Sequence, residues 1–219
     1  MYKLCAFDLD GTLINTIADI AAAVNYGLRE LGYPEHSESE YYHMVGNGMR
    51  KICERALPCE NKDRTDELIA IYGARYVEHC CDLSRPYADI PELLHRLSDA
   101  DISLAVVTNK PQNQSDRVVS TFLSEFSFIE VLGQSDRFPS KPAPDMLRHV
   151  IERFGFLEGE TLYIGDSNVD VDFAHAAFVP CAGAAWGFRG RDELERSGAE
   201  FVVEKASEIA EIVLTAESR

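Results

Sequence analysis

The sequence has too few basic residues for a protein that binds polyanions. Its 219 residues include 21 Lys and Arg against 37 Asp and Glu, which gives a net charge of −16. This balance disfavours nucleic acid or an anionic membrane surface as a partner. No apolar run approaches the ~20 residues of a membrane span, and no basic segment with a following apolar stretch opens the chain. We therefore expect a cytoplasmic protein that binds neither membrane nor nucleic acid.

Common cysteine, histidine and nucleotide motifs are also missing. The six cysteines form no Cys-x-x-Cys pair, and the six histidines show no His-x-x-x-His spacing. A structural zinc site and a disulfide framework are therefore not expected, and we interpret the cysteines as reduced thiols. The sequence also lacks the Gly-x-x-x-x-Gly-Lys-Ser/Thr loop, which disfavours a kinase-like nucleotide binder.

The most informative segment present is an apolar run from Leu4 to Phe7 that ends in Asp8-Leu9-Asp10-Gly11-Thr12-Leu13. A short apolar run closed by glycine is typical of a strand buried on both faces. Asp8 and Asp10 are two residues apart, so both carboxylates can face one crevice if the extended backbone continues. Neighbouring carboxylates repel unless a cation or shared proton relieves them. The segment indicates a metal site or acid/base chemistry, or else a loop whose aspartates cap the next helix.

The residues Asp8 to Leu13 resemble the first motif of the haloacid dehalogenase (HAD) superfamily phosphatases. The resemblance implies that Asp8 is a nucleophile that forms an aspartyl-phosphate and that Asp10 is the general acid and base. A carboxylate that attacks phosphorus divides one difficult hydrolysis into two easier displacements. The backbone N–H groups of the loop, at Leu9 and Gly11, are expected to contact the phosphate.

The periodicity of the rest of the chain predicts two kinds of structure. Apolar residues at helical spacing follow the first motif, with Thr16 and Asp19 as a capping pair, and no strand pattern interrupts residues 16–84. From residue 85 onward, helix and strand signals alternate, with strands expected at 103–107, 128–132, 161–164, 181–185 and 201–203. This alternation predicts an α/β fold with a doubly wound, Rossmann-like parallel sheet. We expect a core of residues 1–15 and 85–219 and an inserted all-helical cap of residues 16–84.

Polar residues follow three further predicted strands, where open parallel sheets bind ligands. Thr108 and Asn109 resemble the second HAD motif, whose hydroxyl donates to phosphate oxygens, and Lys141 resembles the third. Asp166, Ser167 and Asp170 resemble the fourth, which implies Mg²⁺ held by Asp8, Asp166 and the backbone carbonyl of Asp10. Asp170 is expected to orient its loop or pair with Lys141. Each segment also has an ordinary structural explanation. The Thr108 segment fits a strand-to-helix turn, Lys141 fits a surface loop next to proline, and Asp170 fits a charge that stabilises a helix N-terminus.

The position of the insertion implies the C1 type of helical cap. Three stretches resemble the phosphoglycolate phosphatase branch: Ala21 to Asn25, Val45 to Gly48, and Trp186 to Arg189. Phe178-Val179-Pro180 departs from the glycine commonly found there. The resemblance implies a Mg²⁺-dependent phosphomonoesterase, monomeric or homodimeric, that acts on a small phosphorylated metabolite such as 2-phosphoglycolate.

Three alternatives stay open at this point. A sugar-phosphate phosphatase or mutase uses the same core, and so does a phosphonatase, which a Schiff-base lysine in the cap would favour, with Lys51 and Lys62 as candidates. A non-catalytic phosphate-binding module is the third. We further expect the cap to be a mobile lid that brings Asn47, Gly48 and Arg50 to the substrate, with Arg50 as an anion contact.

Overall fold

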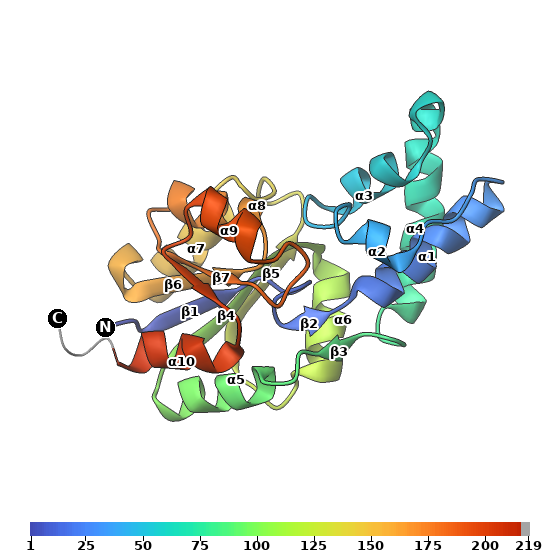
Figure 1. Cartoon of the computed structure of the whole chain (residues 1–219). Coiled ribbons are helices and arrows are strands. Elements are labelled where there is room, and N and C mark those ends of the chain that lie inside the picture. Colours follow the sequence, from blue (N-terminus) through green and yellow to red (C-terminus); the bar gives the residue numbers. More distant parts are fainter. Residues whose placement is uncertain (216–219) are drawn as a thin grey trace.

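The computed structural model describes residues 1–215 and is built on a sheet of six parallel strands (Figure 1). The strand order is β5-β4-β1-β6-β7-β8, so β1 lies between β4 and β6. All four predicted motifs therefore lie at or just after the carboxyl ends of the central strands or in the loop beyond β5. The strands are β1 (Leu4–Phe7), β4 (Ser103–Pro111), β5 (Phe128–Gln134), β6 (Thr161–Gly165), β7 (Cys181–Ala184) and β8 (Phe201–Val203).

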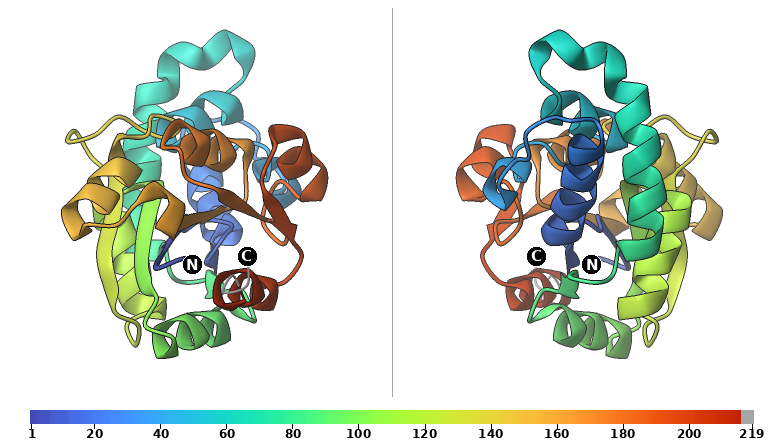
Figure 2. Two further views of the ribbon diagram at one scale, coloured as in Figure 1. Left: turned by 90° about the vertical axis from the view of Figure 1, so that its left-hand side faces the viewer. Right: turned by 90° about the vertical axis from the view of Figure 1, so that its right-hand side faces the viewer.

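Both faces of the sheet are covered by helices, as Figure 2 shows. Side chains alternate along β1, so Cys5 and Phe7 enter one apolar cluster while Leu4 and Ala6 enter the other. This explains why the strand is apolar without interruption, and it confirms the predicted doubly wound α/β fold. One face packs against α5 (Ile90–Asp99), α6 (Gln112–Phe122) and α10 (Ala206–Leu214). The other face packs against α7 (Asp145–Phe154), α8 (Asn168–Ala176) and α9 (Arg191–Ser197). A short 3₁₀ helix, η2 (Glu158–Glu160), precedes β6.

Residues 16–84, which we call the helical lobe, lie to one side of the core (Figure 1). The chain enters and leaves this lobe through a two-stranded antiparallel ribbon. Two residues per strand are too few to show a period-2 pattern, so the ribbon could not be predicted from the sequence. No helix within residues 1–215 is long and apolar enough to cross a membrane. The elements are β2 (Ile14–Asn15), α1 (Ile17–Glu30), α2 (Glu38–Tyr41), α3 (Met49–Ala56), the 3₁₀ helix η1 (Cys59–Arg64), α4 (Thr65–His79) and β3 (Arg85–Pro86).

The predicted capping pair at the start of α1 is wrong. Helix α1 has no side-chain cap, and the Thr16 hydroxyl donates instead to Asp10 Oδ1 over 2.8 Å. The buried Asp19 carboxylate accepts hydrogen bonds from the backbone N–H groups of Leu83 and Ser84 and from the Ser84 hydroxyl, at 2.6 to 3.1 Å. Asp19 therefore ties the chain that leaves the lobe to the helix that begins it.

Candidate active site

A cavity lies between the core and the helical lobe at the carboxyl ends of β1 and β4. The core lines it with charged and polar residues, whereas the lobe lines it mainly with apolar side chains and glycines. The core residues are Asp8, Asp10, Thr108, Asn109, Lys110, Pro111 and Gln114, and the lobe residues are Ile20, Val45, Gly46, Gly48, Met49, Ile52 and Tyr72.

Asp8 is held rigidly at the end of β1, since its backbone N–H donates to the Ile164 carbonyl of β6 at 2.8 Å. Its side chain is buried, and Lys141 Nζ lies 2.8 Å from Asp8 Oδ1. This short contact is a buried ion pair between the ammonium and the carboxylate. Burial raises the pKa of Asp8 to about 6, although the positive charge of Lys141 opposes the rise. A buried carboxylate that is ionised at neutral pH and faces the cavity is suited to be a nucleophile.

Lys141 is the cation of the site. Its ammonium contacts Asp170 Oδ1 at 2.6 Å and the Tyr163 hydroxyl at 3.0 Å, in addition to Asp8. Burial opposes its charge, but the carboxylates of Asp170 and Asp8 outweigh this effect and raise the pKa of Lys141. Asn109 fixes the backbone of Lys141 from both sides, because its side chain accepts from the Lys141 N–H at 2.8 Å and donates to the Lys141 carbonyl at 3.2 Å.

Three buried carboxylates gather next to this lysine. Oxygens of Asp8, Asp166 and Asp170 lie within 4.8 Å of one another. Burial, followed by the charges of Asp170 and Asp8, raises the pKa of Asp166 well above its ordinary value. One Asp166 oxygen accepts from the Phe188 N–H at 2.6 Å. Such crowding of buried carboxylate oxygens fits a site for a hard divalent cation.

Asp170 is the member of this cluster whose oxygens are already engaged. Its Oδ2 accepts from the Ser167 N–H at 3.1 Å and the Ser167 hydroxyl at 2.7 Å, while Oδ1 faces Lys141. Ser167 and Asp170 thereby form a capping box at the N-terminus of α8. Asp8 and Asp166 are left as the side chains that face the cation site, and Asp170 orients its loop and pairs with Lys141.

Gly11 has a steric role at this site. Its φ of 86° favours glycine, and a Cβ here would lie 2.3 Å from an oxygen of Asp166. Its N–H donates to the Ile14 carbonyl at 2.9 Å, while the carbonyl of Leu9 accepts from the N–H of Leu13 at 3.1 Å. The Gly11 N–H is thus engaged within the turn that lets Asp166 approach.

Asp10 is not one of the three clustered carboxylates, and it is held by Lys110, which no sequence motif had marked as a site residue. Lys110 Nζ contacts Asp10 Oδ1 at 2.8 Å and Oδ2 at 3.1 Å. Strand β4 continues through Pro111 rather than ending at residue 107, and Lys110 N–H donates to the Thr108 hydroxyl at 3.2 Å. The predicted strand end concealed Lys110, because a longer strand would have placed it on the same face as Thr108.

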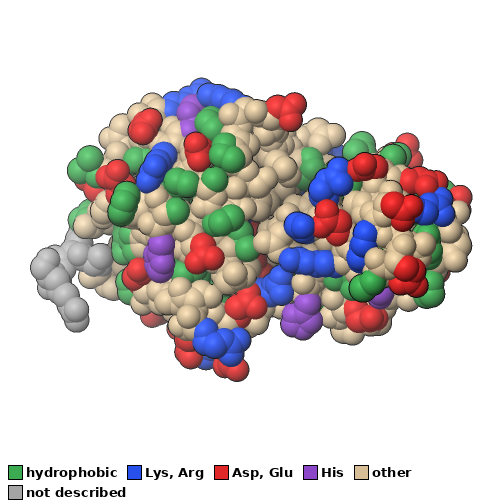
Figure 3. Space-filling view, turned by 90° about the horizontal axis from the view of Figure 1, so that it is seen from above, with side chains coloured by type: hydrophobic (Ala, Val, Ile, Leu, Met, Phe, Trp, Pro, Cys, Tyr) green, Lys and Arg blue, Asp and Glu red, His purple; other side chains and the backbone are tan. Residues whose placement is uncertain are grey.

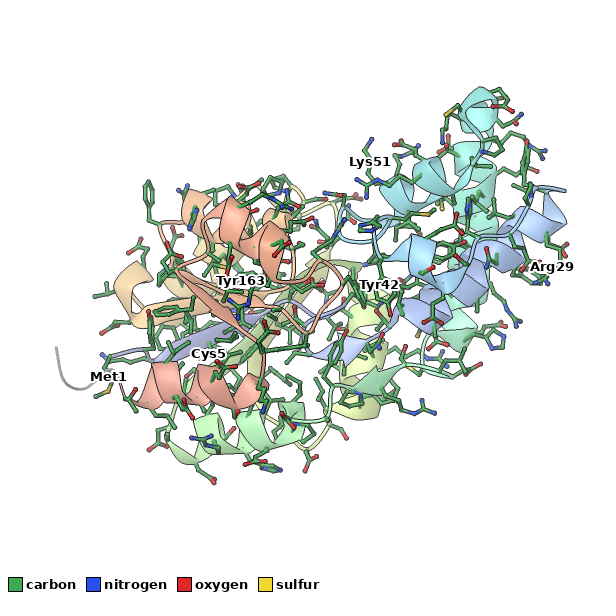
Figure 4. All side chains as sticks on the ribbon, in the orientation of Figure 1. Met1, Cys5, Arg29, Tyr42, Lys51 and Tyr163 are labelled. Atoms are coloured by element: carbon green, nitrogen blue, oxygen red, sulfur yellow. The ribbon has the colours of Figure 1, made fainter. Side chains whose placement is uncertain are left out.

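The three lobe residues predicted to contact substrate are placed differently from one another. Gly48 lines the cavity, whereas Asn47 accepts a hydrogen bond from Arg55 at 2.7 Å. Arg50 lies outside the cavity lining, with its side chain 59% exposed and 2.5 Å from Asp66. Helix α3 starts at Met49, and one helical step of about 100° turns Arg50 from the cavity toward the start of α4. Lys51 is also exposed: it pairs with Glu54 at 2.6 Å and projects upward from α3 in Figure 4.

The loop before α3 is held by arginines from both parts of the molecule. Arg55 of the lobe donates to the Met44 carbonyl at 2.7 Å, and Arg189 of the core donates to the Val45 carbonyl at 2.9 Å. Asn109 adds a longer bond, 3.3 Å, to the Gly46 carbonyl. Basic side chains gather at this boundary in Figure 3. The core thus fixes the lobe loop that closes one side of the cavity.

Comparison with known proteins agrees with this arrangement. The sequence model of the haloacid dehalogenase-like hydrolases matches residues 5–184. Phosphoglycolate phosphatases from Mannheimia succiniciproducens and Haemophilus influenzae strain 86-028NP are 33% and 31% identical, each over 97% of this chain and 98% of the relative. The crystal structure of a predicted phosphoglycolate phosphatase from Haemophilus somnus 129PT superposes with a TM-score of 0.90 at 30% identity, covering 96% of this chain and 97% of that one. Because the family match spans the first, second and fourth motifs as well as Lys141, this chain belongs to the haloacid dehalogenase-like hydrolase family.

Proposed function

We propose that the protein is a Mg²⁺-dependent phosphomonoesterase that hydrolyses a small phosphorylated metabolite through an aspartyl-phosphate on Asp8. The observation that carries this proposal is the buried Asp8 carboxylate, which is paired with Lys141 and opens into a cavity beside a second carboxylate, Asp10. Binding of phosphate alone does not require a nucleophile next to an acid/base group, which argues against a non-catalytic module.

The proposed reaction has two displacements. An oxygen of Asp8 attacks phosphorus, the bond to the leaving oxygen breaks, and Asp10 gives that oxygen its proton. Asp10 then takes a proton from water, which attacks the aspartyl-phosphate and releases phosphate and the free carboxylate of Asp8. Lys141 and the Thr108 hydroxyl, with backbone N–H groups of the loop at Leu9, balance the charge on the equatorial phosphate oxygens. Asn109 serves by holding Lys141 in place.

Mg²⁺ would be held by Asp8, Asp166 and the backbone carbonyl of Asp10. When bound, it supplies positive charge that offsets the carboxylate crowding and the developing charge on phosphate. The carboxylate cluster supports this assignment, because Asp8 and Asp166 offer oxygens and Asp170 is engaged with Ser167 and Lys141. Oxygen ligands of this type are those that Mg²⁺ prefers.

We propose 2-phosphoglycolate as the substrate, in keeping with the names of the relatives at 31 to 33% identity. Residues 16–84 act as a cap over the core of residues 1–15 and 85–219, with the β2–β3 ribbon as the hinge. Neither Lys51 nor Lys62 lines the cavity: Lys51 pairs with Glu54 at 2.6 Å, and Lys62 donates to the carbonyls of Glu54 and Leu57. This placement disfavours the phosphonatase alternative, which needs a cap lysine at the substrate.

The test is phosphate release from a panel of phosphorylated metabolites, with and without Mg²⁺. We expect the highest kcat/KM for phosphoglycolate and no turnover in excess chelator. A preference for a sugar phosphate would instead support the sugar-phosphate phosphatase alternative, and isomerisation of a sugar phosphate would support a mutase. Binding of phosphate without any turnover would indicate a non-catalytic module.

A further inference from the structure

Lys110 is a buried cation that the proposed reaction leaves without a role. Its side chain is 2% exposed, and its ammonium contacts both oxygens of Asp10 at 2.8 and 3.1 Å. A third contact, 2.7 Å long, joins it to the hydroxyl of Tyr76. Burial of an ammonium costs desolvation free energy unless the group is fully paired, and these three contacts supply that pairing.

The partners of Lys110 come from different parts of the molecule. Asp10 follows β1 in the core, whereas Tyr76 lies on α4 of the helical lobe and is fully buried. The Tyr76 ring stacks on Tyr72, which lines the cavity, with 5.3 Å between ring centroids. Within residues 1–215, Lys110 thus links a lobe side chain to the carboxylate proposed as the acid and base.

Asp10 has a further hydrogen bond at the entrance to the lobe. The Thr16 hydroxyl donates to Asp10 Oδ1 at 2.8 Å, just before α1 begins. With Lys110 and Thr16 in place, both groups that orient the carboxylate lie at the junction of core and lobe. Burial opposes the charge of Lys110, but the Asp10 carboxylate outweighs this effect and raises the pKa of Lys110.

We propose that Lys110 is a positioning residue that orients the Asp10 carboxylate for proton transfer, and that Tyr76 of the lobe keeps Lys110 in that position. This inference rests on the proposed phosphatase function and adds a residue to it. The Tyr76 contact couples the orientation of Asp10 to the packing of α4 against the core. The competing explanation is that Lys110 merely neutralises the partly buried Asp10 carboxylate and stabilises the fold.

The leaving group separates these explanations. An alkoxide leaving group needs a proton as it departs, whereas 4-nitrophenolate leaves without one. The parameter kcat/KM reports the steps up to departure of the leaving group, so the later attack of water does not contribute. A residue that acts through Asp10 affects alkyl phosphates far more than aryl phosphates, and a purely structural residue affects both equally.

The experiment measures kcat/KM on phosphoglycolate and on 4-nitrophenyl phosphate for Lys110→Met, Lys110→Arg, Tyr76→Phe and Asp10→Asn. We expect Lys110→Met to lose about 100-fold on the alkyl phosphate and less than about fivefold on the aryl phosphate. Tyr76→Phe should show a weaker form of the same pattern, and Lys110→Arg should recover part of the loss. Adding Lys110→Met to Asp10→Asn should cost little more, because both act on the same proton transfer.

Lys51→Met and Tyr26→Phe are the controls, since both residues lie in the lobe outside the cavity. Equal losses on the two substrates, or full additivity with Asp10→Asn, would overturn the proposal while leaving the phosphatase function intact. If Lys110→Met does not fold, Tyr76→Phe removes a single oxygen atom and decides the question by the same comparison. A parent enzyme that hydrolyses neither ester, nor any phosphate monoester in the panel, would instead overturn the proposed function and this role with it.

Discussion

The core and the helical lobe line the same cavity with opposite chemistry. The core contributes charged side chains, among them the buried Asp8 and Lys110 and the partly buried Asp10, and each is paired across elements distant in sequence. The lobe contributes glycines, aliphatic side chains and Tyr72. Its basic residues pair with nearby acids at the surface, as Arg50 does with Asp66 and Lys51 with Glu54.

This difference indicates how the work is divided between the two parts. Charges fixed in a buried core act on a reacting phosphate without reorganising, which makes them effective in catalysis. Exposed ion pairs on the lobe are screened by water and contribute little. The lobe is suited to exclude water and limit substrate size. It contacts the charged residues of the core through Tyr76 and lines the cavity with Gly46 and Gly48.

The largest effect is expected for Asp8→Asn, which tests the contribution of the core to catalysis. We expect turnover to fall by at least about 1,000-fold, because an amide is a very poor nucleophile in place of the carboxylate. The fold should persist, since the change removes one charge from a crowded cluster. Turnover of a phosphate ester and thermal unfolding, both measured on fresh protein to avoid deamidation, check these points.

The matched control is Asp172→Asn, an exposed carboxylate on α8 that should leave both readouts unchanged. Activity of Asp8→Asn within about tenfold of the parent, a loss of only ~1.4 kcal/mol of transition-state stabilisation, would contradict the covalent mechanism.

Mg²⁺ should affect the stability of the core in a pH-dependent way. The pKa of Asp8 is raised to about 6 and that of Asp166 is raised well above its ordinary value. The folded state therefore binds these protons more readily than the unfolded state, and this stabilising contribution is lost as the pH rises through the folded-state pKa values. In the absence of metal, the site therefore stabilises the fold more at pH 5 than at pH 7.5.

Saturating Mg²⁺ should restore the stability that the fold loses between pH 5 and pH 7.5. At about 100 times its Kd, Mg²⁺ should add roughly 2.7 kcal/mol at pH 7.5, or an increase in Tm of roughly 5 to 10 °C, and less at pH 5 because protons compete. Thermal unfolding with Mg²⁺ or chelator at both pH values measures this. Asp166→Ala is the comparison that should abolish the shift, and an equal shift in that variant would remove Asp166 from the metal site.

Asp19→Asn should show how firmly the lobe is joined to the hinge. The substitution keeps the shape of the side chain but weakens the hydrogen bonds from Leu83 and Ser84, so unfolding should become easier by about 1 to 3 kcal/mol. Urea unfolding gives this value. Asp66→Asn, which removes an acid whose side chain is 80% exposed, should cause no measurable change. Equal stability of both variants and the parent would mean that the buried network contributes nothing to the attachment.

The smallest effect is expected for Arg50→Ala. Because Arg50 faces Asp66 outside the cavity, kcat/KM should change less than about twofold for both a carboxylate-bearing phosphate and a neutral aryl phosphate. Met49→Ala is the matched variant, since Met49 is adjacent in sequence and lines the cavity. A tenfold loss in Arg50→Ala confined to the carboxylate-bearing substrate would show that the lobe rearranges to bring this arginine to the site.

Several elements of the fold were readable from the sequence because they follow local rules. The apolar β1 run and the alternation of helices and strands after residue 85 predicted the parallel sheet, and the lack of strand patterns in residues 16–84 predicted the helical insertion. The one glycine that the resemblance led us to expect near residue 178 is replaced by Phe178, which keeps a left-handed φ of 62° with its ring 78% exposed. The turn is thus preserved despite the substitution, at a cost of roughly 1 to 2 kcal/mol.

The sequence by itself made Asp8, Asp10, Lys141 and Asp166 candidates, because residue types and motif order along the chain carry the resemblance to the HAD motifs. Only the tertiary structure decided what each touches. The Lys110 contacts to Asp10 and Tyr76 span 100 and 34 residues, and the turn of Arg50 away from the cavity depends on where α3 starts. Sequence patterns carry local periodicity, whereas contacts between distant residues depend on how the lobe packs on the core.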